Sequence, residues 1–156
     1  MWSDKETWGN DIPPLEGEAV EIPSGQHLLV DVQTVPRLAF VAVYGSLIFP
    51  SNEADHNYHQ TFDTNYILVK NGYLEIGTEE QPFNSKLTIT LHGTEEDPYL
   101  PTYGNKVLGV RYGTLDMHGK VRSHVWTELA ETAPADSSTI TLMDVGGEEL
   151  DWQVGE

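Results

Sequence analysis

The stretch Tyr66-Ile-Leu-Val-Lys-Asn-Gly-Tyr-Leu-Glu-Ile76 joins two short apolar runs through a glycine turn. The same order of aromatic or amide residue, glycine, any residue and leucine occurs at Tyr44–Leu47 and Tyr112–Leu115. The three glycines are 27 and 41 residues apart, which is close to one coil of a parallel β-solenoid with outward loops of variable length. The sequence therefore predicts an all-β chain that forms a short, three-faced, right-handed parallel β-helix with long surface loops and about four to five coils.

Aligning the three copies on their glycines predicts which side chains face the core, because successive side chains of a strand point to opposite sides of the sheet. The first inward column is Leu47, Leu74 and Leu115, and the second is Phe49, Ile76 and Met117. The outward positions between these columns are Ile48, Glu75 and Asp116. Before the turn, the same alignment predicts that Val43, Lys70 and Arg111 occupy equivalent positions on successive coils.

Composition favours one globular domain over residues 1–156, and its charge limits the partners that the domain can bind. The chain has 25 acidic and 8 basic residues, a formal net charge of -17, and no cysteine. This balance argues against nucleic-acid binding, which needs Lys and Arg to displace counterions. No apolar run is long enough to cross a bilayer, and Met1 does not open a signal peptide. We expect a module cut from a longer protein.

Further strands and caps are expected outside the repeat. The runs Val125–Thr132 and Thr139–Leu142 alternate in the way that strands do. The ends of a solenoid must hide their apolar core from water. We therefore expect the four tryptophans to cap and fill those ends: Trp2, Trp8, Trp126 and Trp152.

Two polar stretches, residues 50–63 and 94–105, are predicted to be surface loops that border any binding site. Their aromatic side chains either anchor a ligand or pack on the flank of the solenoid: Tyr58, Tyr99 and Tyr103. The first stretch also contains three residues of the kind that bind transition metals: Asp55, His56 and His59. Because no further ligand completes a tetrahedral set, the sequence predicts no metal site there.

The outward charges of the repeat have two interpretations. Glu75 and Asp116 are expected at equivalent positions on neighbouring coils, about 4.8 Å apart, where two carboxylates could bind Ca²⁺ or act as acid and base on a glycosidic bond. Lys70 and Arg111 could then engage the carboxylate of an acidic sugar. Alternatively, all four are solvated charges that partly neutralise one another. No catalytic residue is assigned, and a glycan site requires both pairs on one face.

Several separate motifs resemble the G8 domain family in their order along the chain. They are Trp2-Ser-Asp-Lys-Glu-Thr-Trp-Gly9, Leu74-Glu-Ile-Gly-Thr-Glu-Glu-Gln-Pro-Phe83, Gly113-Thr-Leu-Asp-Met-His-Gly119, Trp126-Thr-Glu-Leu-Ala130 and Asp151-Trp-Gln-Val-Gly155. The chain is most similar to the fibrocystin-like branch, and it is also related to the G8 domains of cell-surface and secreted hyaluronan-degrading proteins.

The resemblance implies an extracellular module of a membrane-anchored cell-surface protein, or alternatively of a secreted one. We expect a non-enzymatic interaction or structural domain that presents loops to protein or glycan ligands and packs beside an adjacent β-helix domain. The alternative is a module that binds a hyaluronan-like polysaccharide and assists its depolymerisation by a neighbouring domain. No cofactor is expected, although Ca²⁺ is possible. Fold resemblance alone supplies no chemistry.

Overall fold

A computed structural model describes residues 1–9, 12–52, 57–144, 146–147 and 150–152. These residues contain one 3-10 turn, η1 (Lys5–Trp8), and otherwise regular structure is all β. The strands are β1 (Ala19–Ile22), β2 (His27–Leu29), β3 (Thr34–Leu38), β4 (Phe40–Val43), β5 (Ser46–Phe49), β6 (His59–Thr64), β7 (Ile67–Lys70), β8 (Tyr73–Ile76), β9 (Lys86–Leu91), β10 (Leu108–Arg111) and β11 (Thr114–Met117). Within the described ranges, no helix is long and apolar enough to cross a membrane.

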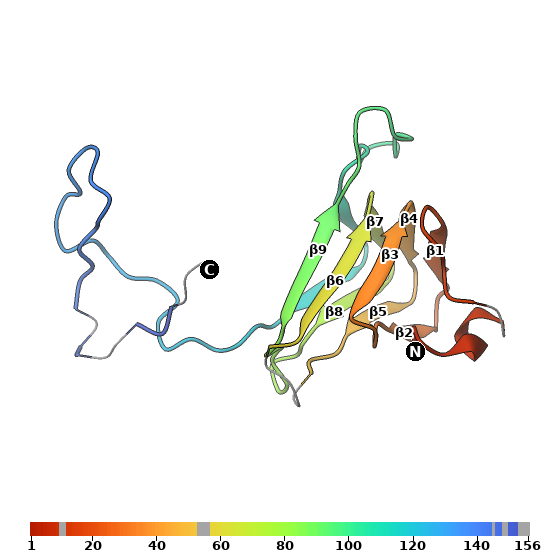
Figure 1. Cartoon of the computed structure of the whole chain (residues 1–156), viewed down its shortest axis with the longest axis horizontal. Coiled ribbons are helices and arrows are strands. Elements are labelled where there is room, and N and C mark those ends of the chain that lie inside the picture. The colour runs from red at the N-terminus through yellow and green to blue at the C-terminus, as the bar shows by residue number, and fades with distance from the viewer. Residues whose placement is uncertain (10–11, 53–56, 145, 148–149, 153–156) are drawn as a thin grey trace. The chain divides into compact units, whose positions relative to one another are not determined.

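The strands form three parallel sheets that the chain visits in turn (Figure 1). The first sheet has the order β1-β4-β7-β10, the second β11-β8-β5-β2, and the third β3-β6-β9. Each strand therefore pairs with the strand three places along the chain, which is a β-helix-like arrangement. The predicted all-β class and parallel pairing are confirmed. The described strands form three complete coils and two strands of a fourth. About four to five coils were expected.

The chain divides into two compact units, Met1–Lys120 (unit 1) and Val121–Glu156 (unit 2). All eleven strands belong to unit 1. In unit 2, the predicted strands over 125–132 and 139–142 are reduced to one isolated bridge between Leu129 and Leu142. The indole Nε1 of Trp152 donates to the His124 carbonyl oxygen at 2.5 Å. A single domain over residues 1–156 stays a prediction.

The inward leucine column follows the predicted register. Leu47 pairs with Leu74, which pairs with Leu115, and Leu28 extends the column by one coil. The predicted loop over 50–63 is wrong at its end, because residues 59–63 belong to β6. That strand alternates between half-buried and buried side chains, so its apolar positions pack inward like those of its neighbours.

The predicted register of Val43 with Lys70 is also wrong. Val43 pairs with Val69, and Lys70 pairs with Arg111. Counted between the pairs Val43–Val69 and Ser46–Tyr73, the earlier coil has two corner residues (44–45) and the later coil has three (70–72). Asn71 has a φ of 53°, a left-handed conformation that asparagine tolerates better than most residues.

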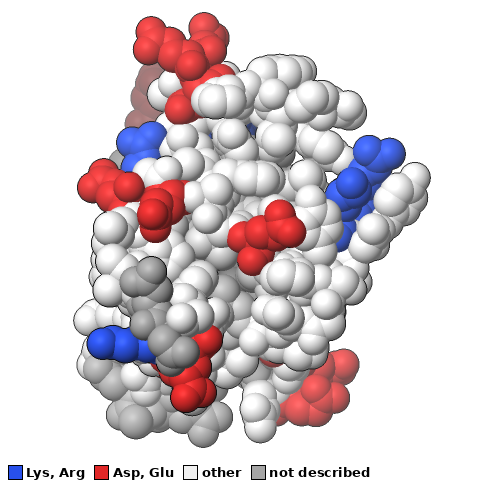
Figure 2. Space-filling view, turned by 90° about the vertical axis from the view of Figure 1, so that its right-hand side faces the viewer, with Lys and Arg blue, Asp and Glu red and all other residues white. Residues whose placement is uncertain are grey.

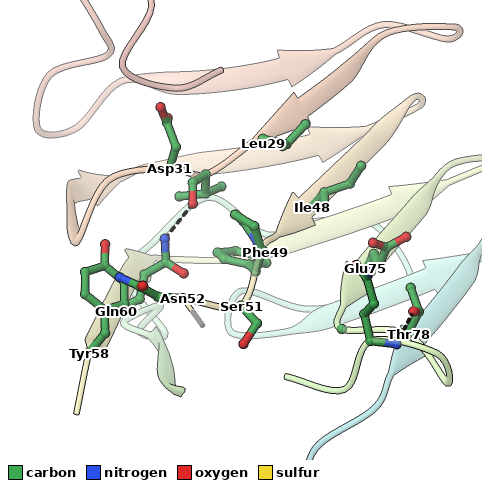
Figure 3. A pocket seen from close by; sticks show the side chains of 14 residues that line it. Leu29, Asp31, Ile48, Phe49, Ser51, Asn52, Tyr58, Gln60, Glu75 and Thr78 are labelled. Atoms are coloured by element: carbon green, nitrogen blue, oxygen red, sulfur yellow. Dashed lines mark hydrogen bonds between the residues drawn. The ribbon is translucent and has the colours of Figure 1, made fainter. Parts of the chain in front are cut away.

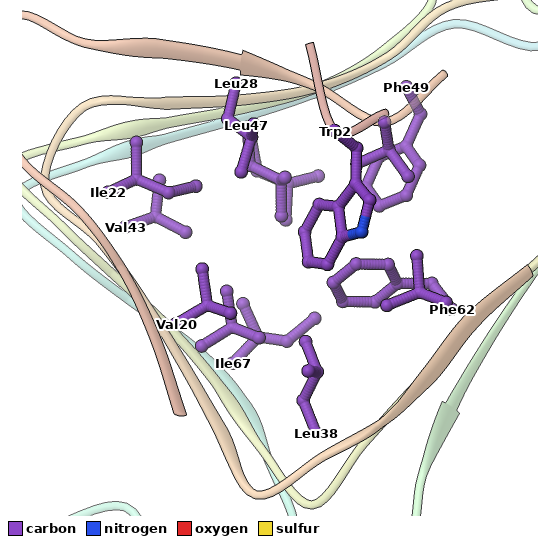
Figure 4. Close-up of a cluster of buried hydrophobic side chains, with 14 of the residues drawn as sticks. Trp2, Val20, Ile22, Leu28, Leu38, Val43, Leu47, Phe49, Phe62 and Ile67 are labelled. Carbon is purple, nitrogen blue, oxygen red and sulfur yellow. The ribbon is translucent and has the colours of Figure 1, made fainter. Parts of the chain in front are cut away.

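Unit 1 is closed at its first coil by an aromatic cap, as expected for the N-terminal tryptophans. Figure 4 shows the Trp2 indole inside the triangle of strands, beside Phe62. Its ring centroid lies 5.1 Å from that of Trp8 and 6.0 Å from that of Phe62. The Trp2 backbone N–H donates to the Leu29 carbonyl oxygen at 2.8 Å, which holds the cap on β2. Trp126 and Trp152 are exposed residues of unit 2.

The last coil differs from the others because its inward side chains are exposed. Leu74 is fully buried, whereas Leu115 is 42% exposed and Met117 is 56% exposed. The prediction that both columns are core therefore holds for β5 and β8 and fails at β11. Leu115 and Met117 continue the two columns by register, so their exposure marks an apolar coil with no further strand of unit 1 stacked on it.

The repeated glycines lie where the backbone of one coil crosses the corner of the coil before it. A Cβ atom on Gly45 or Gly72 would lie within 3.0 Å of backbone carbonyl oxygens, and at Gly113 it would lie 2.8 Å from the Gly72 oxygen. The glycines are needed for this close approach, whereas the left-handed φ angles of the corners belong to Asn71 and Tyr112. A side chain at any of the three corners would push neighbouring coils apart.

We predict that Gly72→Ala lowers the free energy of unfolding by at least ~2 kcal/mol, because the new methyl group meets fixed backbone atoms. Chemical denaturation followed by circular dichroism measures the change. Gly119→Ala is the matched control, since a Cβ there meets no atom within 4 Å, and its effect should stay within about 1 kcal/mol. Equal effects of the two substitutions would contradict the role assigned to the glycine corners.

Candidate functional site

The outward column of the second sheet runs through four strands. Leu29 pairs with Ile48, Ile48 with Glu75, and Glu75 with Asp116. The predicted adjacency of Glu75 and Asp116 on neighbouring coils is therefore correct, and both side chains are partly exposed. The column changes from apolar to acidic along the stack of coils.

Asp116 is held by two neighbours on the same outer surface. The Tyr73 hydroxyl donates to one carboxylate oxygen, and the His118 Nε2 lies 2.7 Å from the other. The Tyr73 hydrogen bond, followed by the contact with His118, holds the pKa of Asp116 below its ordinary value of 3.8. A general acid for glycoside hydrolysis needs a raised pKa. The environment of Asp116 favours a structural carboxylate.

The basic pair lies on another sheet. Lys70 and Arg111 pair at the ends of β7 and β10, in the first sheet, and both are exposed. The Arg111 guanidinium lies over the Tyr112 ring, 5.4 Å from its centroid. The structure therefore brings the two basic residues together and the two acidic residues together, but it places the two pairs on different faces.

A pocket of about 830 Å³ opens at the corner that follows β2, β5 and β8. Its lining combines the outward column with the corner segments (Figure 3). The lining residues that matter for binding are Leu29, Asp31, Ile48, Tyr58, Gln60 and Glu75. No described residue of the lining is Lys, Arg or His, so the described part of the wall is negative or neutral.

Of the three predicted ligand-binding tyrosines, Tyr58 lines this pocket. Tyr99 is 69% exposed and lies outside the lining. The Tyr103 ring lies against the face of Gly109, which fits the alternative of loop packing on the flank. Asp31 and Gln60 belong to the pocket but not to the predicted residues.

Gln60 is the least ordinary side chain of the pocket because it is polar, 1% exposed and only partly paired. Its Nε2 donates to the Val30 and Val32 carbonyl oxygens at 2.6 and 2.7 Å. Its Oε1 has no hydrogen-bond partner among the described atoms. Rotating the Gln60 amide by 180° would place its oxygen against the two carbonyl oxygens. The amide oxygen therefore has no described donor in either orientation.

Asp31 is fixed by the N-terminal cap. The Ser3 backbone N–H donates to Asp31 Oδ1 at 2.9 Å, and the Ser3 hydroxyl donates to Oδ2 at 2.5 Å. Partial burial acts to raise the pKa of Asp31, but the hydrogen bonds from Ser3 lower it overall. Burial and then the Asp31 charge raise the pKa of Tyr58. At neutral pH the pocket therefore contains a carboxylate beside a protonated phenol.

The residues considered for a metal do not form a described site. Asp55 and His56 lie outside the described residues. His59 Nε2 lies 2.8 Å from Thr88 Oγ1, across β6 and β9. Among the side chains that the structure describes, no group of three His, Cys, Asp or Glu is placed to hold a metal ion.

On the face drawn in Figure 2, Asp and Glu form several separate groups rather than one patch. Their spread fits the interpretation of the net charge as a solvated, repulsive surface. The pocket is distinguished by its shape and by Gln60, not by charge alone.

We predict that Tyr73→Phe raises the pKa of Asp116 towards 3.8 by removing the donor. The bond to Asp116 raises the pKa of Tyr73 to about 12 from 10.0. The hydrogen bond between Tyr73 and Asp116 therefore stabilises the fold fully below pH 10, and this stabilisation is lost as the pH rises through about 12. At the acid end, the contribution is present above pH 3.8 and is lost as the pH falls through the lowered pKa of Asp116.

Carboxyl NMR titration and phenolate absorbance measure the two groups. Tyr112→Phe, at an exposed ring, is the control and should leave the titration of Asp116 unchanged. An unaltered Asp116 titration in Tyr73→Phe would refute the assignment.

Comparison with known proteins agrees with the resemblance of the motifs. The G8 domain family matches residues 7–130. Fibrocystin-L of Mus musculus is 41% identical over 157 residues, covering 100% of this chain and 4% of that protein. Fibrocystin-L of Homo sapiens is 41% identical over 99% of the chain and 3% of that protein, and fibrocystin of Mus musculus is 33% identical over 99% of the chain and 4% of that protein. The chain spans a small fraction of these relatives, and it belongs to the G8 domain family.

Proposed function

We propose that this G8 domain is a non-enzymatic, extracellular interaction module of a large, membrane-anchored cell-surface protein of the fibrocystin-like kind. Support comes from the curated relatives, in which the matching segment is 3–4% of a much longer protein. The stacked coils are taken to be a right-handed solenoid, because crossovers between parallel strands of one sheet are right-handed in nearly all proteins. Such a scaffold holds its corner segments rigidly.

The observation that carries the proposal is the pocket around Gln60. It combines an apolar floor, an aromatic wall and an unpaired buried acceptor. Small-molecule and glycan sites have this composition, a mostly apolar cavity with a few fixed polar groups. Its volume of about 830 Å³ lies within the usual range of roughly 300–1,000 Å³.

The alternative of a hyaluronan-like ligand is less well supported. A polysaccharide of repeated uronates needs cationic partners, and the described lining has none. Lys70 and Arg111 lie on another sheet, and the low pKa of Asp116 does not suit an acid catalyst. We therefore propose binding without depolymerisation. Calcium is tested as a possible ligand, since carboxylate oxygens are the donors that it takes.

We predict saturable binding of the chain to cell-surface glycans or proteins, measured by flow cytometry with a labelled multimer, with and without Ca²⁺. Tyr58→Ala should abolish most of it by removing the pocket wall, whereas Tyr99→Ala, at an exposed loop ring, should not. Size analysis of incubated hyaluronan should reveal no shortening. Absence of cell-surface binding, or hyaluronan cleavage by the chain, would each refute the proposal.

A second role, packing on an adjacent β-helix domain, is favoured by the open last coil. Leu115 and Met117 continue buried columns yet are exposed. Unpaired parallel edges with apolar inward faces are usually covered in native proteins. A further coil of the parent protein, with its own inward apolar columns, has the chemistry to cover them.

We predict that Leu115→Ser changes the free energy of unfolding of this chain by less than about 1 kcal/mol, while the register equivalent Leu74→Ala costs about 2–5 kcal/mol. In a longer fragment that includes the following domain, Leu115→Ser should become destabilising by a further ~1–2 kcal/mol, because the side chain is then buried. Denaturant titration of both lengths provides the measurement. The same small effect in both lengths would rule out packing at this coil.

A further inference from the structure

We infer that the pocket around Gln60 binds a neutral, hydroxyl-rich saccharide. The inference rests on the proposed function, since it names the ligand class of the same pocket. It follows from three properties of the lining: it contains two carboxylates and the Gln60 amide oxygen as acceptors, it has no cationic side chain among the described residues, and it includes apolar and aromatic side chains.

The acceptors require a ligand that donates hydrogen bonds. The Gln60 Oε1 is buried without a partner, and a buried unpaired acceptor costs about 1–3 kcal/mol until a donor reaches it. The Asp31 oxygens each receive one hydrogen bond from Ser3 and retain further acceptor capacity. Glu75 adds a third acceptor from β8. The hydroxyl groups of a saccharide are donors of the kind that such acceptors take.

The charge of the lining selects against acidic ligands. The lining contains two acidic residues, Asp31 and Glu75, and the chain as a whole has a formal net charge of -17. A carboxylate or sulfate placed between them would be repelled and would find no opposite charge in the lining. Uronate and sulfated polysaccharides are therefore disfavoured in this pocket.

The buried position of Gln60 favours binding of a sugar over binding of a basic peptide. An ammonium or guanidinium group would have to lose its hydration beside a neutral amide oxygen, at a cost of several kcal/mol. A hydroxyl group loses much less. Leu29, Ile48 and the Tyr58 ring give the pocket apolar surfaces, which suit the C–H faces of a sugar ring. Figure 3 shows these side chains among those that line the pocket.

The test is a glycan array probed with the whole chain, followed by NMR titration with the best neutral saccharide. The array carries neutral hexose and N-acetylhexosamine oligomers, uronate and sulfated oligomers that include hyaluronan fragments, and an oligolysine peptide. Neutral saccharides should bind, and they should shift the Gln60 side-chain amide resonances together with those of Tyr58. Glu75→Gln should weaken this binding about tenfold, which corresponds to one charged hydrogen bond.

Glu21→Gln on β1 is the matched control, because it makes the same change at an exposed strand position outside the pocket and should leave affinity unchanged. Binding of acidic glycans or oligolysine in place of neutral sugars, with the same Gln60 shifts, would overturn the ligand class while retaining a binding pocket. Binding without shifts at Gln60 and Tyr58 would overturn the pocket assignment. Absence of binding by every probe and by cell surfaces would overturn the proposed function as well.

Discussion

The close approach of neighbouring coils at their corners is the constraint on which the rest of the structure depends. At Gly45 and Gly72 the backbone of one coil lies so near the carbonyl oxygens of the preceding coil that a Cβ atom cannot fit. Only glycine permits this approach without displacing backbone atoms. The parallel hydrogen bonds of the second sheet, which follows these corners, then form with Ser46 opposite Tyr73 and Ile48 opposite Glu75.

That register builds the pocket as a secondary consequence. It places Leu29, Ile48 and Glu75 in one outward column, and it stacks the corner segments that supply the remaining walls. The N-terminal cap contributes as well, since Trp2 fills the first coil while Ser3 holds the Asp31 carboxylate. Core packing and the candidate site are thus connected through the same few residues.

The repeat allowed the fold class and the pairing of Glu75 with Asp116 to be predicted, because glycine spacing reports directly on coil stacking. The single-residue shift at the corner of residues 70–72 could not be predicted, since aligning the copies on their glycines gives both coils the same spacing. Gln60 was missed because β6 was taken as part of a loop, although the alternation of Gln60, Phe62 and Thr64 indicates an inward face. The exposure of Leu115 and Met117 depends on the absence of a further strand beside β11 in the described part of unit 1, which composition does not reveal.

Disulfide trapping across the second sheet tests most directly whether the glycine corners set the register that forms the pocket. The chain has no cysteine, so a variant with two introduced cysteines can form only the intramolecular disulfide between those two positions. Ile48→Cys with Glu75→Cys should cross-link readily, because adjacent strands place Cα atoms about 4.8 Å apart, within disulfide range. Ile48→Cys with Tyr73→Cys, a diagonal pair roughly 7–8 Å apart, should remain reduced. Preferential cross-linking of the diagonal pair would contradict this account of the fold and its pocket.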